Sequence, residues 1–376
     1  MRKILILTGR YLPGHKDGGP LRTIINVTDA LGDDYEFYIG CLDRDHGDTE
    51  AYSNIVYNEW NIVGKARVWY VKPGCFSFKL IKKLSSSVDL IYLCGFYNDY
   101  AYKTLILNHM NKLKGIPVVV AAMGTFSDGA LSNKTLKKKT FINVCKKLGL
   151  FRKIKWSVTS TLELSDVKKN IGKKAECIIA EDLPRTNIPG INPDKIDDGI
   201  LKVVFLSRIC AHKNLLGAIK CLNGLTYNVK FTIYGPIEDT EYWKKCKIEL
   251  QKLPDNILWR YDGDVPSENV QEKLQEQDVF LLPTMGENYG HVIFEALSVG
   301  CIPVISDRTP WKIIADQSAG FVLPVTEDMI AFKNTLVMLS KMQFLQRQQL
   351  SEQAVRIAKD KVEQSRRDAG YKKIFG

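Results

Sequence analysis

The sequence of 376 residues lacks a long hydrophobic run. None of its apolar stretches approaches the roughly 20 residues that a membrane-spanning helix needs. The first apolar run follows a basic start but breaks at Gly9, too early for a signal peptide, so we expect a first buried strand there. Short repeats and low-complexity segments are absent as well. What remains is a globular composition, and the length fits two domains of roughly 180 residues better than one.

Paired cysteine motifs are also missing. The nine cysteines are scattered, odd in number, and form no C-x-x-C pair. This pattern argues against a disulfide framework and against a zinc site, and it is typical of reduced thiols. We therefore expect a cytoplasmic protein.

Positive charge is in excess, and it is concentrated in one place. The net charge is +11, and Lys134 to Lys155 include nine basic residues and no acidic one, interleaved with apolar residues. A basic amphipathic segment at 134–156 can bind an anionic membrane surface, which would make the protein peripheral on the cytoplasmic face of the membrane. The alternative is an ordinary surface helix with a solvated basic face. Nucleic acid is not an expected partner, because no binding module accompanies the charge.

Short β-branched and aromatic runs alternate with helix-like stretches in both halves of the sequence. The expected strands are residues 3–8, 35–41, 88–94 and 116–122, then 201–207, 229–234, 257–261, 278–283 and 301–306. Continuous apolar strands separated by helices indicate parallel sheets covered on both faces. We therefore predict an α/β protein with two doubly wound, Rossmann-like domains and a cleft between them.

A stretch rich in Pro, Gly, Asn and Asp separates the two series of strands. We predict a first domain at 1–185, a linker at 186–199 and a second domain at 200–355. The polar, helical segment at 356–376 either caps the second domain or packs back on the first.

Two glutamates frame a predicted helix in the second domain. Glu287 lies in the loop after the strand at 278–283, and Glu295 lies about a turn and a half into the helix that follows. The free N–H groups at this helix start suit a phosphate or pyrophosphate, and Gly290 allows close approach. Because a carboxylate accepts hydrogen bonds at both oxygens, Glu295 suits a ribose diol, and Glu287 suits a further hydroxylated group. This layout is that of a nucleotide sugar.

Two further features point to phosphate. Arg208 and Lys213 follow the first strand of the second domain, where two cations can neutralise a leaving diphosphate. Gly18 and Gly19 follow the first strand of the first domain, and a glycine turn before a helix can bring backbone N–H groups against phosphate.

Together, these motifs resemble the retaining GT-B glycosyltransferases of family 4. The matching elements are Glu287-x7-Glu295 within "GENYGHVIFEAL", "SR-x4-KN" at 207–214, "YGP" at 234–236 and "GGP" at 18–20. Their order and spacing match over nearly the whole chain.

The resemblance implies that the second domain binds a nucleotide sugar and the first binds the acceptor. It implies catalytic roles for Arg208 and Lys213 at the diphosphate and for Glu287 at the donor sugar. The donor-binding residues that it implies are Gly18, Gly19, Tyr234, Gly235, Pro236, Val265, Asn288, Tyr289, Gly290, His291, Val292 and Glu295. It further implies retention of the anomeric configuration, with no metal and no cofactor beyond the sugar nucleotide as co-substrate.

One loop of the first domain departs from the family pattern. The stretch at 121–139 lacks the histidine that many relatives carry and the arginine of another subset. We predict acceptor-side roles for Gly124, Ser127 and Asp128, although Asp128 also suits a helix N-cap. The "DRD" at 43–45 matches a metal-binding Asp-x-Asp only in isolation, because the surroundings of that motif are missing, so no metal site is predicted.

The sequence thus predicts a retaining hexosyltransferase that moves sugar from a UDP-sugar, or a GDP-sugar, to a glycan acceptor. A lipid-linked acceptor in surface polysaccharide synthesis is expected from the charge and from the family. Two alternatives stay open: a nucleotide-sugar epimerase or phosphorylase of the same fold, and a non-enzymatic sugar-nucleotide-binding scaffold. A dinucleotide dehydrogenase is disfavoured, because the first turn lacks G-x-G-x-x-G.

Overall fold

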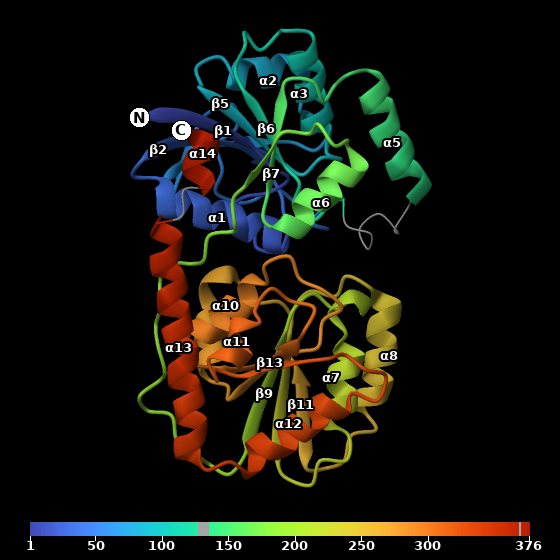
Figure 1. Cartoon of the computed structure of the whole chain (residues 1–376), viewed down its shortest axis with the longest axis vertical. Coiled ribbons are helices and arrows are strands. Elements are labelled where there is room, and N and C mark those ends of the chain that lie inside the picture. The colour runs from blue at the N-terminus through green and yellow to red at the C-terminus, as the bar shows by residue number, and fades with distance from the viewer. Residues whose placement is uncertain (127–134, 368–369) are drawn as a thin grey trace. The chain divides into compact units, whose positions relative to one another are not determined.

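The computed structural model describes residues 1–126, 135–367 and 370–376, and it divides the chain into two compact units (Figure 1). Unit 1 comprises Met1–Leu183 together with Arg367–Gly376, and unit 2 comprises Pro184–Arg366. Each unit is built on one sheet, and each is described below by itself.

Unit 1 contains an eight-stranded sheet in the order β3-β4-β2-β1-β5-β6-β7-β8. All neighbouring strands pair in parallel except β3 and β4, which are antiparallel. The strands are β1 (Arg2–Leu7), β2 (Tyr35–Leu42), β3 (Asn61–Val63), β4 (Ala66–Val71), β5 (Leu90–Cys94), β6 (Val118–Ala121), β7 (Ile154–Val158) and β8 (Cys177–Ile179). The strand order reverses between β1 and β5, the position where ligands bind in open α/β sheets.

Helices cover both faces of the first sheet and produce two cores. Side chains alternate along β1, so Leu5 and Leu7 enter one core while Ile4 and Ile6 enter the other. The helices are α1 (Gly19–Leu31), α2 (Phe78–Leu84), α3 (Asp99–His109), α5 (Thr135–Lys147), α6 (Thr161–Asn170) and α14 (Gly370–Phe375). Figure 1 shows α1 and α14 on one face of the sheet and α2 and α3 on the other.

Helix α14 brings the end of the chain into unit 1. Phe375 is fully buried, and its ring packs edge-on against the rings of Tyr35, Phe37 and Tyr92. Tyr371 and Ile374 are buried in the same core. These residues make the last helix an integral part of the first unit.

Unit 2 contains a six-stranded, wholly parallel sheet in the order β11-β10-β9-β12-β13-β14. The strands are β9 (Leu201–Leu206), β10 (Val229–Tyr234), β11 (Ile257–Tyr261), β12 (Val279–Leu282), β13 (Ile302–Ser306) and β14 (Phe321–Leu323). This is the 3-2-1-4-5-6 order of a dinucleotide-binding sheet, and its reversal point lies between β9 and β12.

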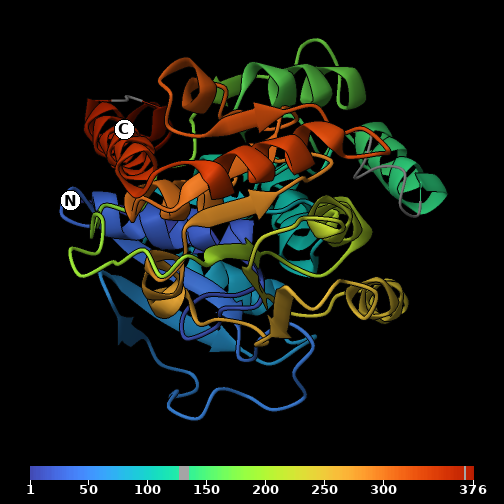
Figure 2. The same ribbon diagram turned by 90° about the horizontal axis from the view of Figure 1, so that it is seen from below.

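Helices cover the second sheet on both faces. They are α7 (Leu215–Leu222), α8 (Thr240–Leu250), α9 (Val270–Gln275), α10 (His291–Ser298), α11 (Ile313–Asp316), α12 (Ile330–Lys341) and α13 (Phe344–Arg367), with short 3₁₀ turns at Ala211–Lys213 and Ser267–Asn269. Figure 1 shows α7 and α8 on one side of the strands and α10 and α11 on the other. Figure 2 looks nearly along α13, and its buried residues Ala354, Ile357, Ala358 and Val362 belong to the core of unit 2.

The predicted fold class is confirmed, and each expected strand is present. The sequence patterns did not predict β3, β4, β7, β8 and β14, of which three have only three residues. The structure also sets boundaries that differ from the expected ones. Residues 186–199 belong to unit 2, and the return to unit 1 begins at Arg367 rather than near 356.

The basic segment at 134–156 is not one structural element. Helix α5 ends at Lys147, and the segment then turns into β7. Ile142, Cys145 and Ile154 are buried in the core, whereas Val144 and Leu148 are exposed. The structure therefore agrees with a surface helix whose apolar side packs mainly on its own domain. In the described part of the chain, no helix is long and apolar enough to cross a membrane.

Asp182, just before the chain enters unit 2, is a buried carboxyl group. Thr23 of α1 donates a hydrogen bond of 3.0 Å to it, but burial outweighs that bond and raises the pKa of Asp182 to about 7. The charges of Glu163 and Glu181 act in the same direction as burial. A raised carboxyl pKa stabilises the folded state at low pH, and that stabilisation is lost as the pH rises through about 7.

We predict that Asp182→Asn removes this pH dependence. The variant and the wild type should have similar free energies of unfolding near pH 4, because Asp182 is then neutral in the folded protein. At pH 8 the variant should be more stable, by on the order of a few kcal/mol, since the buried group no longer ionises. Urea unfolding between pH 4 and 8 measures the difference. A difference that does not change with pH would contradict the prediction.

Candidate functional site

The loops that follow β9 and β12 are joined at the reversal point of the second sheet. The amide of Met285 donates to the carbonyl of His212 at 2.8 Å, and the imidazole Nε2 of His212 lies 2.9 Å from the carbonyl oxygen of Gly286. The side-chain amide of Asn214 donates to the carbonyl of Pro283 at 2.9 Å. These bonds bring two motifs that are about 70 residues apart in the sequence into one site.

Lys213 and Glu287 form an ion pair within this site. The Nζ of Lys213 lies 2.5 Å from Oε1 of Glu287, and each side chain is only 11% exposed. Lys213 ends a 3₁₀ turn, and Asn214 then takes a left-handed conformation with φ of 59°. The Asn214 side chain caps α7 by accepting from the amide of Gly217, so the local sequence fixes the backbone that carries Lys213.

Arg208 has a more open environment. It pairs with Glu238, and both side chains are nearly half exposed. Glu238 follows the Tyr234–Pro236 segment and was not among the predicted site residues. The arginine can therefore turn toward a ligand at little cost, because an exposed pair contributes only about 0–1 kcal/mol.

Gly235 is required by a close approach between two backbones. A Cβ at this position would lie 1.9 Å from the carbonyl oxygen of Ser207, and φ of Gly235 is 133°. The contact lets the strand pairing continue past β9 and β10, where the amide of Ile209 donates to Pro236 at 2.9 Å. Tyr234 is buried and belongs to the core of unit 2, and its carbonyl accepts from the amide of Ser207 at 3.1 Å.

Helix α10 begins at a glycine in the left-handed region. Gly290 is its N-cap, with φ of 81° and ψ of 59°. The predicted residues Asn288 to Val292 lie around this start, and the rings of Tyr289 and His291 are 4.7 Å apart. The indole of Trp311, which the sequence did not single out, donates to the carbonyl of Tyr289. Trp311, in the loop after β13, therefore helps to fix the backbone at the start of α10.

Glu295 is buried within α10, with 4% of its surface exposed. The guanidinium of Arg185 lies 3.9 Å from its Oε1 and donates at 3.1 Å to the carbonyl of Ser267. Ser267 is two residues after Val265. Arg185 therefore contacts both Glu295 on α10 and the segment next to Val265, which were predicted separately as donor-binding residues. Arg185 was missed because it precedes the expected linker and belongs to no motif.

The glycine turn of unit 1 begins α1. Gly18 has φ of 65° and ψ of −137°, a conformation available in practice only to glycine, and it is the N-cap of α1. Gly19 has open space around its Cα, since a Cβ there would meet nothing within 4 Å. A glycine cap provides no side-chain acceptor, and Pro20 has no N–H, so the amides that this helix start can offer to an anion are those of Gly19 and Leu21.

Asp45 holds the loop that precedes this turn. The carboxylate is 3% exposed and accepts from the amides of His15 at 2.7 Å, Lys16 at 3.1 Å and His46 at 2.8 Å. Asp43 is fully buried and accepts from Arg44 and from the hydroxyl of Tyr57. In the "DRD" sequence, Asp45 therefore anchors the backbone, and Asp43 binds the side chains of Arg44 and Tyr57. Among the described residues, no group of three or more His, Cys, Asp or Glu side chains could hold a metal ion.

Gly124 is the one predicted acceptor-side residue that the structure describes. Its amide donates to the buried carboxylate of Glu163, which also accepts from the amide of Thr159 at 2.6 Å. Glu163 was not predicted, because a glutamate in a helix gives no sign that it binds a distant loop. Ser127 and Asp128 lie outside the described residues.

A comparison with known families gives a match in unit 2. Residues 191–356 match the family described as "Glycosyl transferases group 1". The group 1 match begins before β9 and ends within α13, so it includes the loops that carry Lys213 and Glu287 and the helix α10 that carries Glu295. A search of curated proteins finds no match.

Solved structures of glycosyltransferases share the fold over the whole chain. HepE from Anabaena, in complex with UDP and glucose, is 16% identical with a TM-score of 0.71, covering 98% of each chain. Sucrose-phosphate synthase from Thermosynechococcus elongatus is 13% identical with a TM-score of 0.73, covering 100% of this chain and 99% of that one. The fold of this chain is therefore GT-B.

We predict that Lys213 and Glu287 are energetically coupled. Lys213→Met leaves the largely buried Glu287 without its cation, and Glu287→Gln leaves the largely buried Lys213 without its anion. Each single variant should therefore be less stable than the wild type. The double variant should lose less than the sum of both, with a coupling of about 0.5–3 kcal/mol. Urea unfolding of the four proteins measures it.

The exposed pair Lys252–Glu249, with side chains 59% and 42% exposed, is the matched control for this cycle. Its coupling should be close to zero because solvent screens it. If the coupling energies of the two pairs were equal, the prediction that burial strengthens the Lys213–Glu287 interaction would be wrong.

We predict that Asp45→Asn loosens the loop before Gly18, because an amide offers one acceptor oxygen where the carboxylate offers two. Amide hydrogen exchange at His15, Lys16 and His46 should become faster, and stability should fall by about 1–3 kcal/mol. Asp48→Asn is the control, since the carboxylate of Asp48 accepts from the side chain of Lys16 at 2.7 Å and is 41% exposed. Unchanged exchange in the Asp45 variant would show that the anchor is dispensable.

Proposed function

We propose that the protein is a retaining glycosyltransferase of the family 4 type, which transfers a hexose from a nucleotide diphosphate sugar to a hydroxyl of a glycan. The supporting observation is the buried Lys213–Glu287 pair, at the carboxyl ends of β9 and β12 in a unit matching glycosyl transferases group 1. We favour a UDP-sugar, because HepE, which shares the fold, is described in complex with UDP and with UDP-glucose.

Each polar group would have one role in donor binding. Arg208 and Lys213 would neutralise the diphosphate, and the first amides of α10, around Asn288 to Val292, would bind its oxygens. Glu295 would accept hydrogen bonds from the ribose diol, and Glu287 from hydroxyls of the donor sugar. Tyr234, Gly235, Pro236 and Val265 would flank the base. In unit 1, the Gly18–Gly19 turn offers amides to phosphate.

Arg185 gains a role in this proposal. Its guanidinium lies near the carboxylate of Glu295 and also binds the carbonyl of Ser267. A ribose bound to Glu295 would therefore meet a carboxylate that is already oriented. Orientation before binding lowers the entropic cost of forming the complex.

The reaction needs no group outside the site and its two substrates. The bond between the anomeric carbon and the diphosphate oxygen breaks, and the electron pair stays on the departing diphosphate. The acceptor oxygen bonds to the same face of the anomeric carbon, and its proton passes to the diphosphate. The two cations stabilise the charge that develops on the leaving group, so we propose that transfer proceeds without a metal.

The acceptor and the location are further parts of the proposal. We propose a lipid-linked glycan as acceptor, in surface polysaccharide synthesis, at the cytoplasmic face of a membrane. WaaG, described as a glycosyltransferase involved in lipopolysaccharide biosynthesis, shares the fold with a TM-score of 0.61 at 13% identity, covering 96% of this chain and 98% of that one. The basic residues of α5 would interact with anionic headgroups, at about 1 kcal/mol for each cation near the surface.

Thermal unfolding with UDP, GDP and their sugars, in the presence of a metal chelator, tests the donor site. The preferred nucleotide at about 100 times its dissociation constant should stabilise the folded protein by about 2.7 kcal/mol. Absence of stabilisation by any of them would contradict the proposal. Stabilisation without turnover on any acceptor would instead favour a binding scaffold.

Two variants separate the roles of the carboxylates. Glu295→Ala should weaken binding of the bare nucleotide, because the ribose loses its acceptor. Glu287→Ala should abolish sugar transfer while nucleotide binding is largely retained. Glu241→Ala is the control, since this side chain lies on α8 and is 75% exposed. Normal transfer by both site variants would show that the assignment is wrong.

A further inference from the structure

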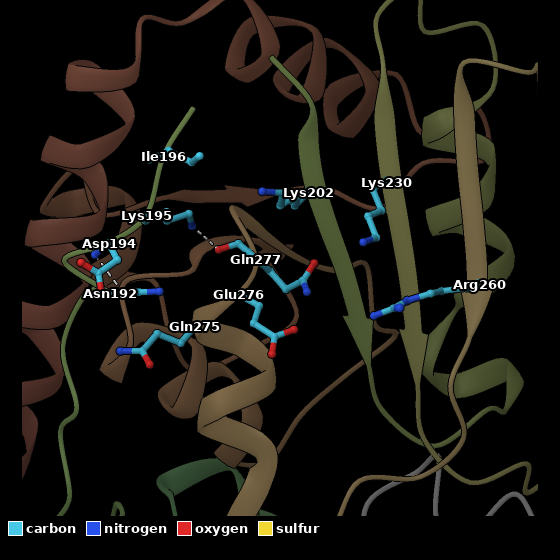
Figure 3. A pocket seen from close by; sticks show the side chains of 10 residues that line it. All are labelled: Asn192, Asp194, Lys195, Ile196, Lys202, Lys230, Arg260, Gln275, Glu276 and Gln277. Atoms are coloured by element: carbon cyan, nitrogen blue, oxygen red, sulfur yellow. Dashed lines mark hydrogen bonds between the residues drawn. The ribbon is translucent and has the colours of Figure 1, made fainter. Parts of the chain in front are cut away.

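Unit 2 contains a polar pocket near the amino ends of β9 and β10, whose described lining includes neither Lys213 nor Glu287. Its volume is about 300 Å³. Lys202 and Lys230, which line it, are the second residues of β9 and β10, whereas Lys213 follows the carboxyl end of β9. Figure 3 shows side chains from these strands, from β11 and from the segment after α9 around one space. None of the ten described residues that line the pocket is among those predicted for the nucleotide-sugar site.

Four cations gather around this space: Lys195, Lys202, Lys230 and Arg260. Three of them have acidic partners. Lys195 lies 2.9 Å from Asp278, Lys202 lies 2.9 Å from Asp198, and Arg260 lies 3.0 Å from Asp262.

Lys230 is the exception. It is exposed, and no residue in the described part of the chain forms an ion pair or a hydrogen bond with its ammonium group. It is opposite Lys202 in the register of β9 and β10, and Arg260 is on the next strand, β11. Like charges on neighbouring strands repel each other, and an anion between them removes the repulsion.

Gln277 adds a hydrogen-bonding group of a different kind. It is 4% exposed and lines the same pocket, yet its Oε1 has no hydrogen-bond partner among the described residues. Figure 3 shows its side chain extending into the space between Lys202 and Arg260. A buried acceptor without a donor costs free energy, so the position favours a ligand that supplies a hydroxyl or amine hydrogen.

We propose that this pocket binds a sugar phosphate of hexose phosphate size. The phosphate would lie against Lys202, Lys230 and Arg260, since cations and phosphate oxygens form strong charge-assisted hydrogen bonds. A sugar hydroxyl would donate to Oε1 of Gln277, and Glu276, which also lines the pocket, would accept from a second hydroxyl. The volume is at the lower end of the range for small-molecule sites, which fits a ligand with a single sugar ring.

Isothermal titration of the full chain with glucose 6-phosphate, inorganic phosphate and glucose tests this site. Glucose 6-phosphate should bind more tightly than phosphate, and glucose should not bind measurably. Lys230→Gln should weaken glucose 6-phosphate binding by about tenfold or more, because it removes the cation without an internal partner. Gln277→Leu should reduce the advantage of the sugar phosphate over phosphate, because it removes the acceptor for a hydroxyl.

Lys247→Gln is the matched control. Lys247 is an exposed lysine in the last turn of α8, so its loss changes the net charge equally without altering the pocket. Wild-type binding in Lys230→Gln, or an equal loss in Lys247→Gln, would overturn the site. Equal affinity for phosphate and glucose 6-phosphate would overturn the sugar part of the proposal.

Stabilisation by nucleotides distinguishes this proposal from the proposed function. Lys230→Gln and Gln277→Leu should respond to UDP as the wild type does, because the two sites use different residues. Binding of glucose 6-phosphate without any stabilisation by nucleotides would support the sugar phosphate site and contradict the proposed nucleotide-sugar site. If a single compound lost its binding in both Lys230→Gln and Glu295→Ala, the independence of the two sites would be overturned.

Discussion

The ion pair between Lys213 and Glu287 is the interaction on which the candidate site depends. Its two residues come from loops about 70 positions apart in the sequence, and they meet because β9 and β12 are neighbours in the sheet. The reversed strand order leaves the space above these two strands uncovered by a crossover helix. The ammonium group of Lys213 and the carboxylate of Glu287 therefore lie where the fold leaves room for a ligand. Hydrogen bonds of His212 and Asn214 hold the two loops together.

Buried carboxylates that accept from backbone amides recur in unit 1. Asp45 fixes the segment before the glycine turn, and Glu163 fixes the loop at Gly124. In both cases one side chain replaces the hydrogen bonds that regular structure would otherwise provide for a loop. A loop held in this way keeps one conformation while its outer surface remains available to a ligand.

The fold could be predicted from the sequence because continuous apolar strands have a strong local pattern. The short edge strands have too few residues for such a pattern, and β7 was hidden at the end of a basic segment. The motifs predicted Lys213, Glu287 and Glu295, since each lies next to a strand end or a helix start. Arg185, Glu163 and Trp311 were missed because their roles depend on distant partners, which no local spacing reveals.

The return of the chain to unit 1 affects the order in which the protein can fold during synthesis. Phe375 and Tyr371 fill the core beneath β1 and β2, yet a ribosome makes them after all of unit 2. Until then, the rings of Tyr35, Phe37 and Tyr92 lack their last aromatic neighbour. Unit 2 can therefore complete its core first, and the first unit to be translated is the last to be finished.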